Sequence, residues 1–199
     1  YLGKQYQGIY VAKIIKVSKH PDADKLNVCL IDDGGANLEV QRDSNNLIQV
    51  VCGAPNVREG MFAAWISPGA TVPASLNEKE PFVISKIKLR GVSSNGMLAS
   101  GKELSLSSDH DGILELSLEN VQEKELLQPG TPFQKLFNLD DVIVDFENKM
   151  FTHRPDLFGQ LGVAREIAGI LGRSFKSPEW YLDQPVFEKG EGLELTVVN

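Results

Sequence analysis

The sequence predicts a mainly β chain followed by a smaller α+β tail. The first 117 residues contain short runs of β-forming residues separated by turn residues, with no strong amphipathic helix between them. This arrangement is typical of a small barrel or a sandwich. In the last third of the chain, apolar residues recur at helical spacing instead. The expected strands span residues 10–17, 26–31, 47–51, 61–66, 82–89 and 112–116.

Turn chemistry separates these strands. Pro21 and Asp22 follow the first run, and Gly34 and Gly35 follow the second. The polar insert at residues 36–46 predicts a long hairpin tip that is exposed and mobile.

A polar, acidic stretch divides the chain. It contains the break Gln128-Pro129-Gly130-Thr131-Pro132. We therefore expect a first domain at 1–117, a linker at 118–140 and a partial α+β domain at 141–199. Because the chain begins at Tyr1 without Met and ends in a β-like run, we also expect a fragment of a longer protein.

One helix is predicted near residues 157–171, with Asp156 as its N-cap and Gly172 just beyond its end. Too little chain follows it to form a large core, so part of its apolar face should be exposed or covered by another chain. The residues at helical spacing are Leu157, Leu161, Ala164, Ile167, Ala168 and Leu171.

Composition narrows the possible functions. With 42% hydrophobic and 24% charged residues, the chain is globular, and no apolar stretch or signal-peptide pattern predicts a membrane span or secretion. The net charge of −7 argues against bulk attraction to nucleic acid. Residues 1–117 carry 12 basic and 13 acidic side chains, whereas 118–199 carry 8 and 14. An anion-binding patch is therefore expected in the first part.

A basic strand is the most informative stretch. Alternate side chains of a strand share a face, so Lys86, Lys88 and Arg90 should point one way while Ile87 and Leu89 point into the core. Cations about 6.6 Å apart match successive phosphates of a nucleic-acid strand. A solvated face that discourages edge pairing explains the pattern equally well.

Two turns add polar groups. The small residues after the basic strand include Ser94 and Asn95, which offer a hydroxyl and an amide for sugar or phosphate contacts. Met97 could lie against a base, although a core Met is the commoner explanation. The turn at 51–58 presents Asn56 and Arg58.

No catalytic motif is visible. Cys52 has no neighbouring His as a base, and Cys29 and Cys52 have no metal-ligand spacing, so two buried cysteines are the expectation. The Walker A, G-x-G-x-x-G and G-x-S-x-G patterns are missing from the sequence. We expect neither catalytic residues nor a metal site.

Three motifs occur in a familiar order: HPDADKL at 20–26, VCGAPNVR at 51–58 and KIKLRGVSSNGML at 86–98. Together they resemble the OB-fold tRNA-binding domain shared by several synthetase-associated proteins. The long insert at 36–46 departs from the commoner short hairpin, and with the β-subunit features that follow, the resemblance covers about residues 8–175.

Further features resemble the bacterial phenylalanyl-tRNA synthetase β subunit. They are SSDHDGILEL at 107–116, THRPD at 152–156 and GVAREIA at 162–168. His153 stands where that family usually has Asn. The resemblance implies a five-stranded OB barrel, tRNA as partner, and an α subunit in a cytoplasmic α2β2 ligase. That ligase joins phenylalanine to tRNA with ATP and Mg²⁺, and its active site lies on the α subunit.

On this resemblance the fragment needs no cofactor, and residues from about 141 form the later half of a split domain. Two alternatives stay open: a structural or docking module with little tRNA contact, and a stand-alone tRNA-binding protein. The residues expected to contact tRNA are Lys25, Asn56, Arg58, Lys86, Lys88, Arg90, Ser94, Asn95 and Met97.

Overall fold

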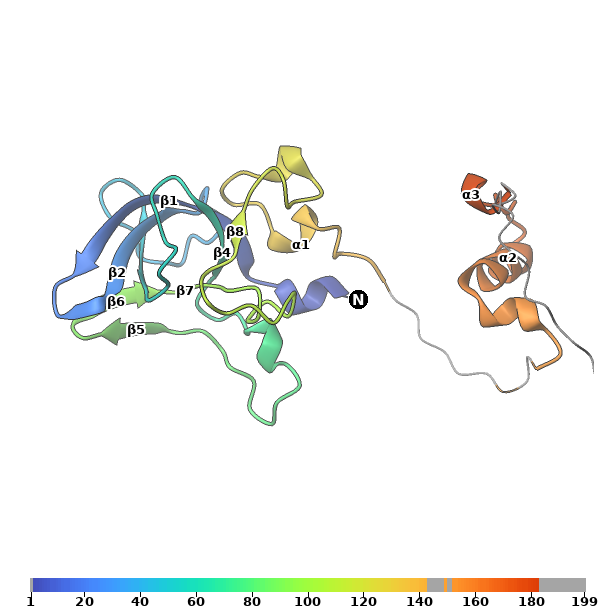
Figure 1. The fold of residues 1–199 in the computed structure, drawn as a ribbon, viewed down its shortest axis with the longest axis horizontal. Helices are drawn as coiled ribbons and strands as arrows, with labels where there is room; N and C mark the ends of the chain where they lie inside the picture. The colour runs from blue at the N-terminus through green and yellow to red at the C-terminus, as the bar shows by residue number, and fades with distance from the viewer. Residues whose placement is uncertain (1, 143–148, 150–151, 183–199) are drawn as a thin grey trace, which may run out of the picture. The chain divides into compact units, whose positions relative to one another are not determined.

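The computed structural model describes residues 2–142, 149 and 152–182, and the chain divides into two units, Tyr1–Val144 and Asp145–Asn199 (Figure 1). The first unit is built on a six-stranded antiparallel sheet in the order β3-β2-β1-β4-β7, with β8 also paired to β4. Its strands are β1 (Ile9–His20), β2 (Ala23–Asp32), β3 (Ile48–Cys52), β4 (Phe62–Ile66), β7 (Met97–Leu98) and β8 (Glu115–Leu116). The prediction of a mainly β first part is confirmed.

Strand β1 organises the sheet. Its first half pairs with β4 and its second half with β2. The register shifts between Ile14 and Lys16, so Ile15 has no partner opposite it in β2. Such a bulge bends a strand. One strand can therefore belong to both halves of the sheet.

A separate hairpin consists of β5 (Lys86–Leu89) and β6 (Val92–Asn95). Side chains join it to β3: Gln49 Nε2 donates to the Ser93 carbonyl at 2.7 Å, and the Val51 amide donates to Ser94 Oγ at 3.0 Å. Asn95 Nδ2, on β6, donates to the Gln49 carbonyl at 3.2 Å. The described strands thus form an open sheet beside a hairpin, not the closed backbone ladder of the expected barrel.

Both faces of the first half of β1 carry buried residues. Ile9 and Val11 pack in one apolar cluster, and Ala12 and Ile14 pack in the other with Trp65. Short helices complete the unit: η1 (Leu2–Tyr6), η2 (Pro73–Ser75), η3 (Lys124–Leu126) and α1 (Phe133–Leu136).

The segment at 118–140 belongs to the first unit, which corrects the expected linker. Phe133 and Leu136 are fully buried in the first cluster, and the Phe133 ring lies 5.4 Å from the ring of Tyr6. The Val11 amide donates to the Thr131 carbonyl at 2.9 Å. Polar composition suggested a linker because the few apolar residues that anchor this segment are scattered among charged ones.

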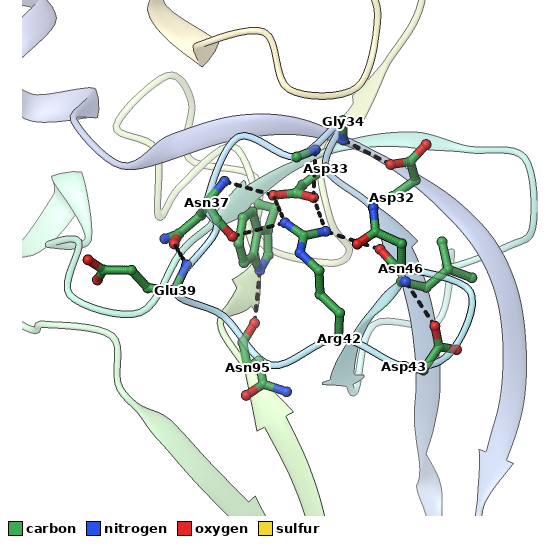
Figure 2. Close-up of polar contacts among 12 residues, drawn as sticks. Asp32, Asp33, Gly34, Asn37, Glu39, Arg42, Asp43, Asn46 and Asn95 are labelled. Atoms are coloured by element: carbon green, nitrogen blue, oxygen red, sulfur yellow. Dashed lines mark hydrogen bonds and ion pairs between the residues drawn. The ribbon is translucent and has the colours of Figure 1, made fainter.

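The insert at 36–46 also differs from its prediction. Asp33 is fully buried, and Arg42 folds back onto it with two bonds, Nη1 to Oδ1 at 2.7 Å and Nη2 to Oδ2 at 2.9 Å (Figure 2). Arg42 also donates to the carbonyls of Asn37 and Asn46. The loop is therefore closed at its base by an ion pair, which the sequence did not predict, while most of its residues are exposed as expected and Leu38 at its apex is 85% exposed.

The charge of Asp33 is stabilised within the fold. Burial by itself raises the pKa of Asp33, but hydrogen bonds from Arg42, Asn37 and Gly35 outweigh it and lower the pKa below its ordinary value. The ionised carboxylate therefore favours the folded state.

We expect an acid-dependent loss of this stabilisation. Because the folded pKa is lowered, the contribution is complete above the ordinary Asp pKa of about 3.9 and is lost as pH falls through the folded value. The difference in unfolding free energy between the wild type and Asp33→Asn should be constant above about pH 5 and shrink below about pH 4. Urea unfolding over a pH series measures it, and a difference that does not change with pH would contradict the assignment.

The second unit contains η5 (Pro155–Phe158), α2 (Gln160–Ile170) and α3 (Glu179–Leu182). Helix α2 starts three residues later than predicted, with Gly159 as its N-cap. Gly172 has a φ of 63° and follows the helix as expected. Ile167, Ile170 and Leu171 are exposed, so the predicted exposure of part of the apolar face is confirmed.

Asp156 does not cap α2, because its carboxylate pairs with arginines. Arg154 donates Nε to Oδ1 at 3.0 Å and Nη2 to Oδ2 at 2.9 Å, and Arg165 adds a bond at 3.1 Å. The hydrogen bond from Arg154 is the main reason that the pKa of Asp156 lies far below its ordinary value. Arg154 also binds Glu166 at 3.0 Å, which ties the Arg-Pro-Asp turn to the helix.

Candidate nucleic-acid interface

The basic residues lie on the β5–β6 hairpin. Lys86 faces Asn95 and Lys88 faces Ser93 across the two strands. Arg90 and Gly91 form the two-residue turn, with φ values of 45° and 86°. Positive φ at both positions is typical of a turn that matches the twist of a hairpin. Arg90 therefore belongs to the turn and not to the strand face that the sequence predicted.

The opposite face of β5 is not in the core. Ile87 is 46% exposed and Leu89 is half-buried, which corrects the expectation that both point into the core. Both line a cavity of about 800 Å³ together with Met97. Phe82, which is exposed, and Ala54 lie on the same cavity. An apolar groove thus runs beside the cations.

The cations differ in how they are held. Lys86 Nζ donates to Gln41 Oε1 at 2.6 Å. Arg90 Nη1 donates to the Asp22 carbonyl at 2.9 Å. Lys25 and Lys88 are exposed and have no hydrogen bond or ion pair within the described part of the chain. Of the basic residues predicted to contact tRNA, Lys25 and Lys88 are therefore the ones whose ammonium groups have no partner in the described part of the chain.

Four of the predicted contact residues have hydrogen-bond or ion-pair partners in the first unit, two of them buried (Ser94, Asn95) and two exposed (Asn56, Arg58). Ser94 and Asn95 are 2% and 3% exposed, and they hold β6 to β3. Asn56 exchanges two bonds with the backbone of Ile113, at 2.8 and 3.0 Å. Arg58 forms an ion pair with Glu115. Ser94 and Asn95 therefore serve the fold, whereas tRNA contact by the exposed Asn56 and Arg58 stays a prediction.

Two hairpin tips meet at this surface. His20, at the end of β1, has one ring nitrogen 3.0 Å from the Leu89 carbonyl, and Arg90 reaches back to Asp22. Figure 1 shows the β1–β2 and β5–β6 hairpins ending close together. Sequence reasoning identified His20 only as part of a motif, because its partner lies 69 positions away.

Nucleophilic chemistry has no support among the described residues. Cys29 and Cys52 are buried free thiols, as expected. Burial, with the neighbouring Cys52 as a smaller cause, raises the pKa of Cys29 to about 12, so this thiol stays protonated. No group of three or more potential metal ligands occurs in the described residues. None of the helices in the described ranges is long and apolar enough to cross a membrane.

A known family matches the part of the chain that contains the sheet and the basic hairpin. The model of the family described as "Putative tRNA binding domain" matches residues 9–123, a range that includes every strand of the first unit. The chain belongs to this family.

Curated relatives point to one particular protein within this broad family. Phenylalanine–tRNA ligase β subunits of Bordetella bronchiseptica and Burkholderia pseudomallei are each 40% identical to this chain, over 87% and 86% of its length. The β subunit of Desulfotalea psychrophila is 39% identical over 83%. These matches confirm the resemblance to the β subunit. The chain spans only 17–19% of the length of these relatives.

Among solved structures, the MetRS related protein from Pyrococcus horikoshii matches 56% of this chain and 81% of its own. At 19% identity and a TM-score of 0.34, that match establishes nothing about the fold.

Proposed function

We propose that this chain is a tRNA-binding module of a phenylalanine–tRNA ligase β subunit. The observation that carries the proposal is the family match over residues 9–123, combined with 40% identity to β subunits over 87% of the chain. The identity extends beyond the family match and into the second unit. A stand-alone tRNA-binding protein is therefore the weaker alternative.

The proposed mode of binding is electrostatic. Lys25 and Lys88 present ammonium groups without protein partners, and Arg90 has guanidinium donors beyond the one used on Asp22. Such groups neutralise phosphates without reading sequence. Because the whole chain carries a net charge of −7, attraction depends on this local patch and should be weak.

The proposal also includes the type of barrel that the sheet and the hairpin form together. We infer an OB-like arrangement in which β6 and β7 together act as one interrupted strand between β3 and β4. Support comes from the bonds that join β6 to β3 and from the pairing of β7 with β4. The interruption falls at Gly96, where φ is 101°.

Within the whole ligase, the module would supply tRNA contact and not chemistry. As part of the same proposal, we assign phenylalanine activation with ATP and Mg²⁺ to an α subunit. The complete enzyme would be a cytoplasmic α2β2 ligase. Neither ATP nor Mg²⁺ is needed by the residues proposed here, since the contacts involve only Lys, Arg and phosphate.

A docking module is the second candidate, and the groove favours it. An apolar surface that includes exposed Phe82 and Ile87 is better suited to a protein partner than to phosphates. This function predicts no tRNA binding by the chain alone.

Salt dependence separates the two functions. With two or three phosphate contacts, the slope of log K against log salt should be about −1.4 to −2.7, with a dissociation constant of roughly 10⁻⁴–10⁻⁶ M. The double variant Lys25→Ala/Lys88→Ala should bind more weakly and flatten the slope by about 1.4–1.8. Fluorescence anisotropy with labelled tRNA over a salt series measures both quantities.

The control is Lys124→Ala/Lys135→Ala, which removes two exposed cations of the same unit in its acidic segment. It should change the slope little. No detectable binding at low salt, or equal effects of the two double variants, would favour the docking module.

A further inference from the structure

His20 lies between two hairpins and is almost completely buried, with 5% of its surface exposed. It is the last residue of β1, and its ring contacts both the turn that follows it and the end of β5. A buried imidazole with both nitrogens engaged is held in one orientation.

The hydrogen bonds fix the tautomer. The Asp22 backbone N–H points at Nδ1 at 3.1 Å, and a backbone N–H can only donate. Nδ1 is therefore the acceptor, and in the neutral ring the proton is on Nε2. Nε2–H accordingly donates to the Leu89 carbonyl at 3.0 Å.

Arg90 adds a second contact between the two hairpins, from the β5–β6 turn back to the β1–β2 turn. Its Nη1 donates to the Asp22 carbonyl at 2.9 Å, so the peptide groups on both sides of Asp22 are bound, one by His20 and the other by Arg90. We call this pair of contacts, His20 to Leu89 and Arg90 to Asp22, the hairpin clasp.

The clasp is needed because the basic hairpin has little other support. Among the described strands, β5 pairs only with β6, and a two-stranded hairpin is marginally stable alone. The side-chain bonds to β3 hold β6 but leave the tip unsupported. The clasp is the connection that holds the tip to the β1–β2 hairpin.

We propose that His20 is a positioning residue of the tRNA-binding surface: through the clasp it sets the separation between Lys25 on the β1–β2 hairpin and Lys88 on the β5–β6 hairpin. This inference rests on the proposed function. A fixed separation means that binding does not have to order the hairpin tip. His20 itself is buried and does not contact phosphate.

Three substitutions separate the two bonds of the ring. His20→Ala removes both. His20→Gln provides an amide N–H with enough reach for the Leu89 carbonyl. His20→Asn provides an oxygen near the Nδ1 position, which can accept from the Asp22 N–H, but it is too short for Leu89. His110→Gln is the control, since His110 is an exposed histidine of the same unit.

tRNA affinity and its salt slope are measured for each variant of the 199-residue chain, with thermal unfolding to confirm that it is folded. His20→Ala and His20→Asn should bind about threefold to tenfold more weakly, as expected when side chains must be ordered on binding. Their salt slopes should equal that of the wild type. His20→Gln should restore most of the affinity, and His110→Gln should bind like the wild type.

Nitrogen NMR of the His20 ring gives a readout without RNA and should show the Nε2–H tautomer. Folded His20→Ala that binds tRNA like the wild type, while Lys25→Ala/Lys88→Ala binds weakly, would overturn the positioning role alone. Failure of the wild type to bind tRNA would overturn the proposed function together with the positioning role.

Discussion

Replacing Arg42 by Ala should lower the unfolding free energy by about 3–5 kcal/mol, because it leaves the fully buried Asp33 carboxylate without its partner. The loss should exceed that of the bonds alone, since an unpaired buried charge costs more than a broken contact. Urea unfolding at neutral pH gives the value.

Arg58→Ala is the matched control for this prediction. It removes an arginine of the same sheet unit from an ion pair with Glu115 in which the two side chains are 57% and 42% exposed. An exposed pair contributes about 0–1 kcal/mol. Equal losses in Arg42→Ala and Arg58→Ala would show that burial of Asp33 does not govern the energetics of the loop.

Gly96→Ala should be as damaging as the loss of Arg42. The φ of 101° is unfavourable for any residue with a Cβ, and an added Cβ would lie 2.6 Å from the Ile66 carbonyl and against the buried Trp65 indole. Strain of about 1–3 kcal/mol and overpacking of about 1–3 kcal/mol together predict a loss of about 2–6 kcal/mol.

Gly91→Ala separates these two causes. Gly91 also has a positive φ, of 86°, but nothing lies within 4 Å of a Cβ built there. Only the conformational part of the penalty should remain, about 1 kcal/mol. Chemical unfolding of both variants tests the comparison, and a larger loss in Gly91→Ala than in Gly96→Ala would contradict the packing argument.

The strands that alternate or concentrate β-branched residues could be predicted from the sequence. Strands β1 to β4 begin and end within three residues of their expected limits. At β6 and β7 the sequence predicts a turn instead, because Ser93, Ser94 and Asn95 have little preference for strands. Hydrogen bonds to β3 hold β6 in its extended conformation, and the partners lie more than 40 positions apart. A local sequence pattern cannot predict such bonds.

The candidate site was only partly predictable for the same reason. Exposed lysines could be recognised by type, and Lys25 and Lys88 are indeed exposed, while their contact with tRNA stays a prediction. Whether a polar side chain faces solvent or serves the backbone depends on residues far along the chain, as Asn56 and Ile113 show at a separation of 57 positions. For the same reason, neither the hairpin clasp nor the Asp33–Arg42 ion pair could be predicted from the sequence.

The ion pair at the base of the 36–46 loop has a practical consequence. Arg42 pairs in antiparallel fashion with Ile48, and the Asp43 amide donates to the Leu47 carbonyl, so the alignment of β2 with β3 is already set below the apex. The exposed apex beyond Asn37, at Leu38 and Glu39, can then vary in length at small entropic cost. A fluorophore or short peptide tag placed at Leu38 should leave the sheet undisturbed, providing an attachment point for binding measurements.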